Sequence, residues 1–119
     1  MKRVRVLVVD DEENIRLLFK EELEEEDYDV ETASNGMEAL EKIKGAPFDV
    51  VVLDIKMPVM DGIQTLNAIK NINKDQPVIL CSAYGEFKQD LSSWVSDGYV
   101  VKSADTRELK ETIKEILSR

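Results

Sequence analysis

Five short apolar segments, separated by stretches with helical periodicity, are the feature that most constrains how this chain can fold. The clearest segments span residues 4–9, 50–53, 78–80 and 99–101, and residues 30–32 form a weaker one in which apolar and polar residues alternate. Uninterrupted apolar segments rich in β-branched residues are typical of parallel strands buried on both faces. The alternating segment is typical of a strand at the edge of a sheet.

The stretches between these segments predict helices. Apolar residues recur at helical spacing in residues 15–23, 37–43, 66–72 and 109–117. Another helix is expected over residues 87–97, although three serines lower its helix propensity. Strand and helix therefore alternate five times, which predicts an α/β fold: a five-stranded, doubly wound parallel sheet with helices on both faces.

The last helix needs a residue that caps its N-terminus, and the sequence offers two. Asp105 and Thr106 precede its first apolar residue, and both residue types are favoured at this position.

Length and composition indicate one globular domain over residues 1–119. Hydrophobic residues make up 43% of the chain and charged residues 34%, which is normal for a folded domain of this size. The net charge of −9 makes direct binding to nucleic acid or to an anionic membrane unfavourable. The lone cysteine, Cys81, allows no internal disulfide and is expected to be a small buried residue. The apolar N-terminal segment is too short to span a membrane, and no cleavage site of a signal peptide follows it. Because a chain without a disulfide fits a reducing compartment, a cytoplasmic protein is expected.

Polar residues follow four of the predicted strands: Asp10, Asp11 and Glu12 after the first, Asp54 after the third, Ser82 after the fourth and Lys102 after the fifth. Because ligands bind at the carboxyl ends of open parallel sheets, these side chains are expected to share one edge. Each residue alone is equally compatible with an ordinary polar strand end. Together they form a coherent set that could bind a phosphoryl group.

The chemistry of this set points to magnesium. Clustered carboxylates repel one another unless a cation or a proton relieves them, and Mg²⁺ prefers one or two carboxylates together with phosphate oxygens. A carboxylate beside such an ion can act as a nucleophile and form an acyl phosphate. Lys102 could then hold a second phosphoryl oxygen, and Ser82 could donate a hydrogen bond to a third.

Four sequence motifs carry a resemblance to a known family. Residues 6–12 (VLVVDDE), 52–62 (VLDIKMPVMDG), 82–85 (SAYG) and 98–102 (GYVVK) resemble, in order and spacing, the receiver domains of two-component response regulators. The resemblance covers essentially the whole chain. It implies a flavodoxin-like receiver fold with the strand order 2-1-3-4-5.

The resemblance also implies roles for the acidic residues. Asp54 would be the phosphoacceptor. Mg²⁺ would be bound by Asp11, Asp54 and the main-chain carbonyl of Lys56, with Asp10 acting mainly through water.

Further roles concern how the phosphoryl group is recognised. The resemblance implies that Lys102 pairs with the phosphoryl group, that Ser82 is the switch hydroxyl, and that the rotamer of Tyr99 follows it. Lys56 and Tyr84, which flank the site, would tune the lifetime of the acyl phosphate.

The chain contains no histidine, so a partner must supply the phosphoryl group. The resemblance implies that this partner is a sensor histidine kinase or a phosphotransfer protein. It would dock on Asn14, Ile15, Leu18 and Ser103. The face formed by the fourth helix, fifth strand and fifth helix would carry output or a weak dimer contact, with a monomer as the other possibility.

One departure from the family concerns the residue after Lys102. Most receivers have a proline there, in a cis peptide bond, whereas this chain has Ser103. A cis bond before a non-proline residue costs about 2.5–4 kcal/mol. We therefore expect a trans bond, or a strained bond held by local contacts.

Alternatives to a phosphorylated receiver are a phosphorylation-independent receiver and an aspartyl-nucleophile phosphohydrolase of the haloacid dehalogenase type. The phosphohydrolase requires a second aspartate two positions after the nucleophile, where this chain has Lys56. The chain is therefore expected not to be an enzyme with an external substrate but to catalyse only its own phosphorylation and dephosphorylation. A stand-alone receiver is favoured over a module of a longer regulator.

Overall fold

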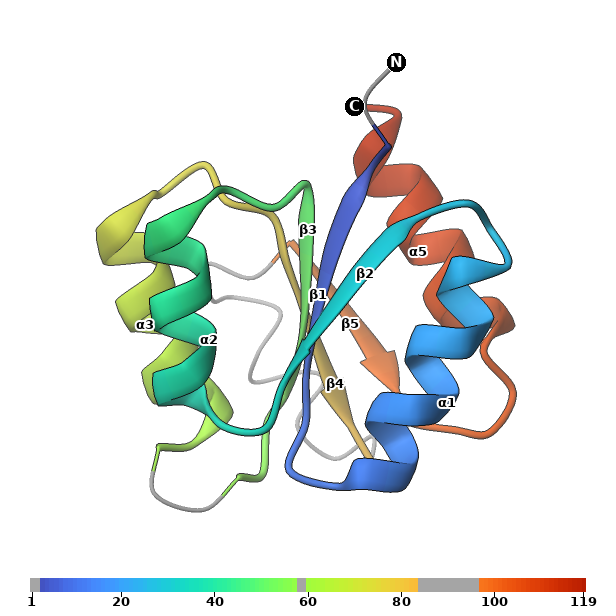
Figure 1. Ribbon diagram of the computed structural model, residues 1–119, viewed down its shortest axis with the longest axis horizontal. Helices are drawn as coiled ribbons and strands as arrows, with labels where there is room; N and C mark the ends of the chain where they lie inside the picture. Colours follow the sequence, from blue (N-terminus) through green and yellow to red (C-terminus); the bar gives the residue numbers. More distant parts are fainter. Residues whose placement is uncertain (1–2, 58–59, 84–96) are drawn as a thin grey trace.

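A computed structural model describes residues 3–57, 60–83 and 97–119. Its centre is a parallel sheet of five strands (Figure 1). The strands are β1 (Arg5–Val9), β2 (Asp29–Ala33), β3 (Val50–Asp54), β4 (Val78–Ser82) and β5 (Gly98–Val101). They lie in the order β2-β1-β3-β4-β5, which confirms the predicted doubly wound sheet with β2 at one edge.

Helices cover both faces of the sheet. The helices α2 (Gly36–Gly45) and α3 (Gly62–Ile72) lie together on one face, and α1 (Glu13–Glu24) and α5 (Arg107–Leu117) lie on the other (Figure 1). Four of the predicted helices are thus confirmed. The helix predicted over residues 87–97 lies almost entirely outside the described residues. Within the part of the chain that the structure describes, no helix is long and apolar enough to cross a membrane.

Successive strand residues fill two separate cores. Leu7, Leu53 and Leu80 pack with α2 and α3, whereas their neighbours Val52 and Ile79 pack with α1 and α5. All five residues are at most 1% exposed. This burial on both faces is the reason that the strands are apolar without alternation.

Two apolar residues at positions that helical spacing assigned to the core, Met37 and Ile72, face solvent instead. Met37 in α2 is 59% exposed and Ile72 in α3 is 41% exposed. In α2 the residue in close contact with α3 is Gly36, since a Cβ atom there would clash with the hydroxyl of Thr65 in α3. The backbone approach at Gly36 turns the next residue, Met37, outward.

Both predicted caps lie at the start of α5, but with divided roles. Thr106 occupies the N-cap position, yet its side chain makes no capping hydrogen bond. The carboxylate of Asp105 instead accepts a hydrogen bond from the backbone N–H of Arg107 at 3.1 Å. The hydroxyl of Thr106 is directed to another helix, as described below.

Candidate functional site

Two buried carboxylates lie side by side at the carboxyl end of the sheet. Asp10 directly follows β1 and Asp54 ends β3, and they are 2% and 4% exposed. The alternation of the strands turns both toward α1 and α5, because Asp10 is two residues after Val8 and Asp54 two after Val52. The neighbour of Asp54 on β4 is Cys81, which is buried as predicted.

Among the described residues, Lys102 is the only one whose ammonium group contacts these carboxylates. Its Nζ atom lies 2.8 Å from Asp10 Oδ2 and 3.6 Å from Asp54 Oδ2. A third contact, of 3.4 Å, reaches the exposed carboxylate of Glu12. The Lys102 side chain is only 8% exposed, and its backbone N–H donates to the carbonyl of Ser82, which continues the pairing of β5 with β4. The predicted convergence of Asp10, Asp54 and Lys102 is therefore observed.

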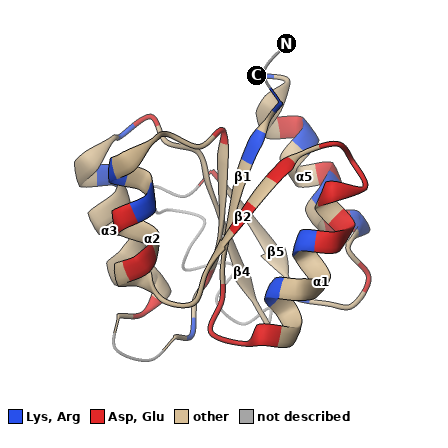
Figure 2. Cartoon of the chain, viewed as in Figure 1, with Lys and Arg blue, Asp and Glu red and all other residues tan. Residues whose placement is uncertain are grey.

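The loop from β1 to α1 concentrates negative charge at this edge (Figure 2). One carboxylate oxygen from each of Asp10, Asp11 and Glu12 lies within 4.8 Å of the other two. The loop is held by two hydrogen bonds: the backbone N–H of Glu12 donates to Asp10 Oδ1 at 2.9 Å, and the guanidinium of Arg16 donates to the Asp10 carbonyl at 2.8 Å. The sequence predicts Glu12 in the polar set at the strand ends but gives no role to Arg16. The position of Arg16 a few residues after the acidic pair was the available signal.

The loop after β3 passes close to the nucleophile candidate. The backbone N–H of Ile55 donates to the Cys81 carbonyl at 3.0 Å, and that of Gly62 donates to the Ile55 carbonyl at 2.7 Å. A Cβ atom at Gly62 would clash with the carbonyl oxygen of Asp54, so only glycine allows this approach. The backbone N–H of Lys56 donates to the Asp54 carboxylate, which places the main chain of Lys56 at the site.

A hollow of about 200 Å³ opens over Asp54, lined by Glu12, Asp54, Lys56, Ser82, Ala83 and Lys102. Ser82 is 1% exposed and lies at the end of β4. Tyr99 is half-buried and packs against the core under α2 and α3. Leu80 is the register partner of Tyr99, and Ser82 is two residues further along β4, so Ser82 and Tyr99 lie on the same face of the sheet.

Burial and charge shift the acid–base properties of the site. Burial, and then the charge of Asp10, raise the pKa of Asp54 to about 7. Burial also raises the pKa of Asp10, more than the hydrogen bond from Lys102 lowers it. Burial disfavours the Lys102 ammonium, but its hydrogen bond to Asp10 and the surrounding carboxylates raise its pKa overall. The site therefore carries an excess of acidic groups over cations.

The chemistry of these donors fits Mg²⁺. Asp10, Asp11 and Glu12 form a group of oxygen donors close enough to share one ion, and Asp54 is near enough that the charge of Asp11 raises its pKa. Magnesium prefers hard oxygen ligands of this kind, with waters completing its shell. The backbone of Lys56 adjoins the same carboxylate.

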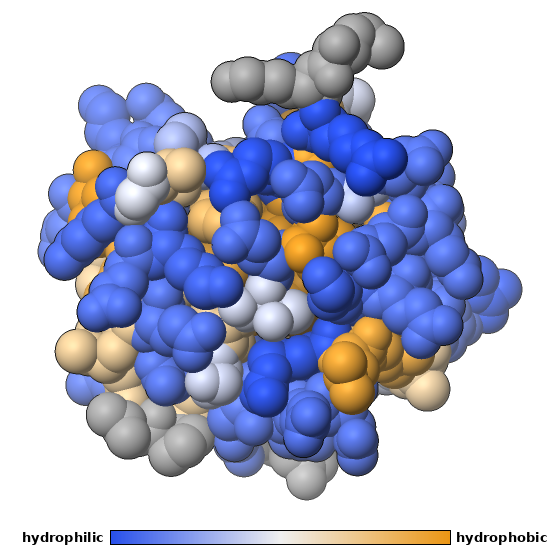
Figure 3. Space-filling view, in the orientation of Figure 1, coloured by the Kyte–Doolittle hydropathy of each residue, from blue (hydrophilic) through white to orange (hydrophobic). Residues whose placement is uncertain are grey.

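The residues predicted to dock a partner differ in exposure. Asn14 and Ser103 are exposed, whereas Ile15 and Leu18 are half-buried and pack against the core under α1 and α5. The exposed apolar residue of α1 is Leu17, at 58%. An apolar patch is visible over α1 in Figure 3.

Two further predictions concern the neighbourhood of Lys102 and of Ser82. The described residues contain no cis peptide bond, so the bond between Lys102 and Ser103 is trans, one of the two expected outcomes. Tyr84, the predicted lifetime residue, lies outside the described residues.

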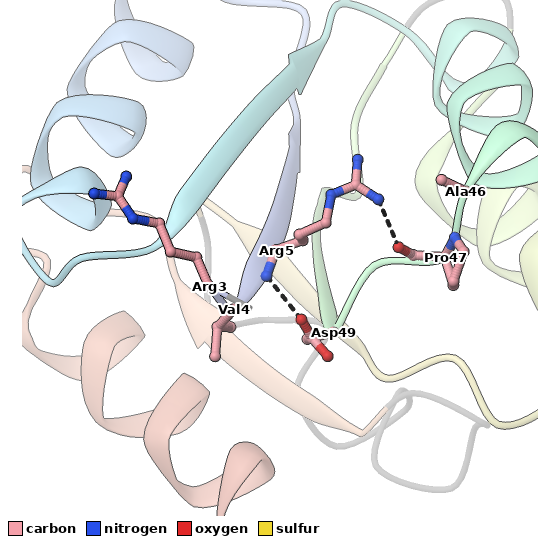
Figure 4. Close-up of a pocket in the computed structure, with 6 residues that line it drawn as sticks. All are labelled: Arg3, Val4, Arg5, Ala46, Pro47 and Asp49. Carbon is pink, nitrogen blue, oxygen red and sulfur yellow. Dashed lines mark hydrogen bonds between the residues drawn. The ribbon is translucent and has the colours of Figure 1, made fainter. Parts of the chain in front are cut away.

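A second hollow, of about 350 Å³, lies at the opposite end of the sheet (Figure 4). Its polar groups are engaged with one another: the backbone N–H of Arg5 donates to Asp49 Oδ2 at 2.7 Å, and the Arg5 guanidinium donates to the carbonyl of Pro47 at 2.9 Å. The guanidinium also lies 4.4 Å from the centre of the Phe48 ring. These contacts join β1 to the segment just before β3. We therefore interpret this hollow as a consequence of packing and not as a binding site.

The fold and the site define a doubly wound α/β protein with an acidic, lysine-paired site at the carboxyl end of its sheet. The sequence model of the response regulator receiver domain matches residues 6–114, and the chain belongs to this family.

Similar proteins agree with this assignment. Response regulator protein TrrA from Thermotoga maritima, solved in complex with Mg(2+)-BeF, is 51% identical with a TM-score of 0.90, covering 96% of this chain and 99% of that chain. Chemotaxis protein CheY4 of Vibrio cholerae is 33% identical with a TM-score of 0.89, covering 98% of this chain and 100% of that chain. Transcriptional regulatory protein SrrA of Staphylococcus aureus is 37% identical over 116 residues, which are 96% of this chain and 48% of that protein. The chain thus spans about half the length of the curated relatives it matches.

Proposed function

We propose that this receiver domain accepts a phosphoryl group on Asp54, in the presence of Mg²⁺, from a phosphohistidine of a sensor histidine kinase or phosphotransfer protein. The observation that carries the proposal is the placement of Asp54. Its carboxylate is buried beside Asp10, lies 3.6 Å from the Lys102 ammonium and lines an open hollow. A nucleophilic carboxylate needs this combination of cations and access.

The proposed metal ligands are those that the resemblance to receiver domains implies. Asp11, Asp54 and the Lys56 carbonyl would hold Mg²⁺, with Asp10 acting mainly through water. When bound, Mg²⁺ neutralises negative charge on the carboxylates and on the phosphoryl oxygens. The similar protein TrrA was solved in complex with Mg(2+)-BeF, which supports the same ligand class for this chain.

In the transfer, a carboxylate oxygen of Asp54 bonds to phosphorus while the bond between phosphorus and the donor histidine nitrogen breaks. The electron pair of that bond stays on the histidine. Lys102 faces the phosphoryl oxygens and offsets their charge, and the buried site holds the carboxylate in place. The products are the modified chain and the regenerated histidine of the donor, and hydrolysis, which releases inorganic phosphate, restores Asp54. We therefore propose that the protein catalyses its own modification and is not an enzyme with an external substrate.

Ser82 and Tyr99 would transmit the change. A phosphoryl group adds about −1.5 to −2 charges and strong acceptor oxygens. Ser82 lines the hollow and shares a sheet face with Tyr99. If the hydroxyl of Ser82 moves to the phosphoryl group, Tyr99 gains space to turn inward, which alters the surface of β5. Lys56, at the rim, would tune the access of water to the acyl phosphate.

The proposed donor surface surrounds the site at the start of α1. It contains Asn14, Leu17 and Ser103, which are exposed, with Ile15 and Leu18 as its half-buried floor. A histidine kinase, ThkA, was solved in complex with TrrA, to which this chain is 50% identical in that structure (TM-score 0.89, covering 96% of this chain and 98% of that chain). We place this exchange in the cytoplasm, as expected for a partner of a sensor kinase.

The test is incubation with a small acyl-phosphate donor and Mg²⁺, followed by intact mass spectrometry. We expect one added phosphoryl group in the wild-type chain, none in Asp54→Asn, and one in the control Asp75→Asn, which alters an exposed aspartate. Labelling that persists in Asp54→Asn would overturn the proposal. Sustained turnover of many phosphate esters per molecule would instead favour a phosphohydrolase.

A further inference from the structure

The loop that carries Lys102 is hydrogen-bonded at its end to the second half of helix α1. The hydroxyl of Thr106, four residues after Lys102, donates to Glu22 Oε1 at 2.9 Å. The same oxygen accepts a hydrogen bond from Lys110 in α5 at 3.0 Å. Glu22 therefore joins the end of the loop, and the first turns of α5, to the second half of α1.

The position of Thr106 makes this contact informative. Thr106 is the N-cap residue of α5 and is only 5% exposed. A threonine at an N-cap ordinarily accepts a hydrogen bond from the first turn of its own helix. Here its hydroxyl donates to Glu22 instead, and the capping interaction comes from Asp105. The Thr106 hydroxyl thus makes a hydrogen bond to α1 in place of a capping hydrogen bond within α5.

The residues between Lys102 and Thr106 are themselves held. The backbone N–H of Asp105 donates to the hydroxyl of Ser103 at 3.1 Å, and Asp105 in turn accepts from the backbone of Arg107. At its other end the loop is fixed to β4, because the N–H of Lys102 donates to the Ser82 carbonyl. Only a short, hydrogen-bonded stretch therefore separates Lys102 from the anchor on α1.

We propose that Thr106 and Glu22 are positioning residues that hold the loop from β5 to α5 and thereby keep the Lys102 ammonium against Asp10 and Asp54. The inference rests on the proposed function, since the reaction in which Lys102 takes part is phosphoryl transfer to Asp54. A lysine side chain has four rotatable bonds and loses much conformational freedom when held. A fixed backbone at its base lowers the further cost of placing the ammonium in the site.

The experiment compares Thr106→Val, which keeps the shape of the side chain but removes its hydroxyl, with Thr106→Ser, which keeps the hydroxyl. The rate constant for phosphoryl incorporation from a small acyl phosphate is measured at saturating Mg²⁺, and the dissociation constant for Mg²⁺ is measured separately. We expect Thr106→Val to slow phosphorylation by about three- to tenfold, the range for the loss of one hydrogen bond, without weakening Mg²⁺ binding. Thr106→Ser should restore the rate.

Glu22→Met provides the second variant, because it keeps the length of the side chain but removes the oxygen that accepts from Thr106. Glu26→Met is its matched control, since Glu26 also pairs with α5, through Lys114 at 3.2 Å, but at a position that does not contact the loop. Glu22→Met should slow phosphorylation and Glu26→Met should not. If Thr106→Val does not fold, Glu22→Met and its control make the same comparison.

A double-mutant cycle separates positioning of Lys102 from general loosening of the domain. In a Lys102→Ala background, measured over longer times, adding Thr106→Val should not slow the reaction further. A further slowing by the same factor, or a wild-type rate in both Thr106→Val and Glu22→Met, would overturn the inference while leaving the proposed function intact. Failure of the wild-type chain to accept any phosphoryl group would refute both.

Discussion

Asp10 and Lys102 form a buried ion pair of 2.8 Å, although they follow β1 and β5, which β3 and β4 separate in the sheet. The lysine side chain reaches across the end of β3 and passes the carboxylate of Asp54 at 3.6 Å. One ammonium group thus faces two buried carboxylates, with Asp11 nearby. The remaining negative charge is what a divalent cation would neutralise.

The pKa of Asp54 predicts how stability depends on pH. This pKa is raised from 3.8 to about 7, so the folded state favours the protonated form. Below pH ~4 Asp54 is protonated in both states and does not lower the free energy of unfolding. As the pH rises from ~4 to ~7, the unfolded chain ionises Asp54 more readily than the folded chain, which lowers the free energy of unfolding. In metal-free buffer, Asp54→Asn should raise the free energy of unfolding by about 2–4 kcal/mol near pH 8 and by almost nothing near pH 4.

Urea denaturation at both pH values measures this difference, and Asp75→Asn, which removes an exposed carboxylate, is the control. An equal effect of Asp54→Asn at both pH values would contradict the raised pKa.

Mg²⁺ should stabilise the folded chain, because the unfolded chain lacks the clustered carboxylates. Binding at one site adds about 2.7 kcal/mol when the free ion is 100-fold above its dissociation constant. Asp11→Asn should reduce this gain, and the exposure of Asp11 means that the substitution leaves the core unchanged. Thermal unfolding across a Mg²⁺ titration provides the measurement; an unchanged gain in Asp11→Asn would exclude Asp11 as a ligand.

Lys102→Ala should separate metal binding from signalling. Removing an ammonium group from the site leaves all oxygen donors in place, so Mg²⁺ binding should be retained or tightened. The conformational change on phosphorylation should weaken, because the phosphoryl group loses its cation. Amide NMR shifts with and without the acyl-phosphate donor report the change, and Lys74→Ala, at an exposed position, is the control. Wild-type shift changes in Lys102→Ala would remove Lys102 from the switch.

Gly62→Ala tests the close approach behind Asp54. Its Cβ atom would clash with the Asp54 carbonyl and lie 2.5 Å from Ile55 Cα, so the loop must shift. We expect a loss of stability of about 1–3 kcal/mol and slower phosphorylation, since overpacking displaces the backbone that carries the nucleophile.

Gly45→Ala is the matched control. A Cβ atom at Gly45, the last residue of α2, meets nothing within 4 Å. It should be neutral or stabilising by up to about 1 kcal/mol, because alanine restricts the unfolded chain. Equal losses in both glycine variants, measured by urea denaturation, would show that the contact at Gly62 is not the cause.

Much of this molecule was predictable from local sequence. Strands buried on both faces must be apolar throughout, so β1, β3 and β4 were visible directly in the sequence, and the alternation with helices indicated the sheet. The carboxyl ends of parallel strands meet at one edge, and this rule alone predicts that Asp10, Asp54 and Lys102 lie close together. The strand order followed from the family resemblance, and the sheet has that order.

What the tertiary structure decided is the partner of each polar group and the outward or inward direction of each helix residue. Periodicity places Leu18 and Phe19 on the apolar face of α1, but only the packing of the helix on the sheet buries Phe19 while Leu18 stays half-buried. Likewise, the residue type and position of Thr106 predict a helix cap, but its hydrogen bond to Glu22 exists only because α5 lies beside α1. Local sequence determines which backbone conformations are favourable, whereas contacts between distant residues depend on how the elements pack against one another.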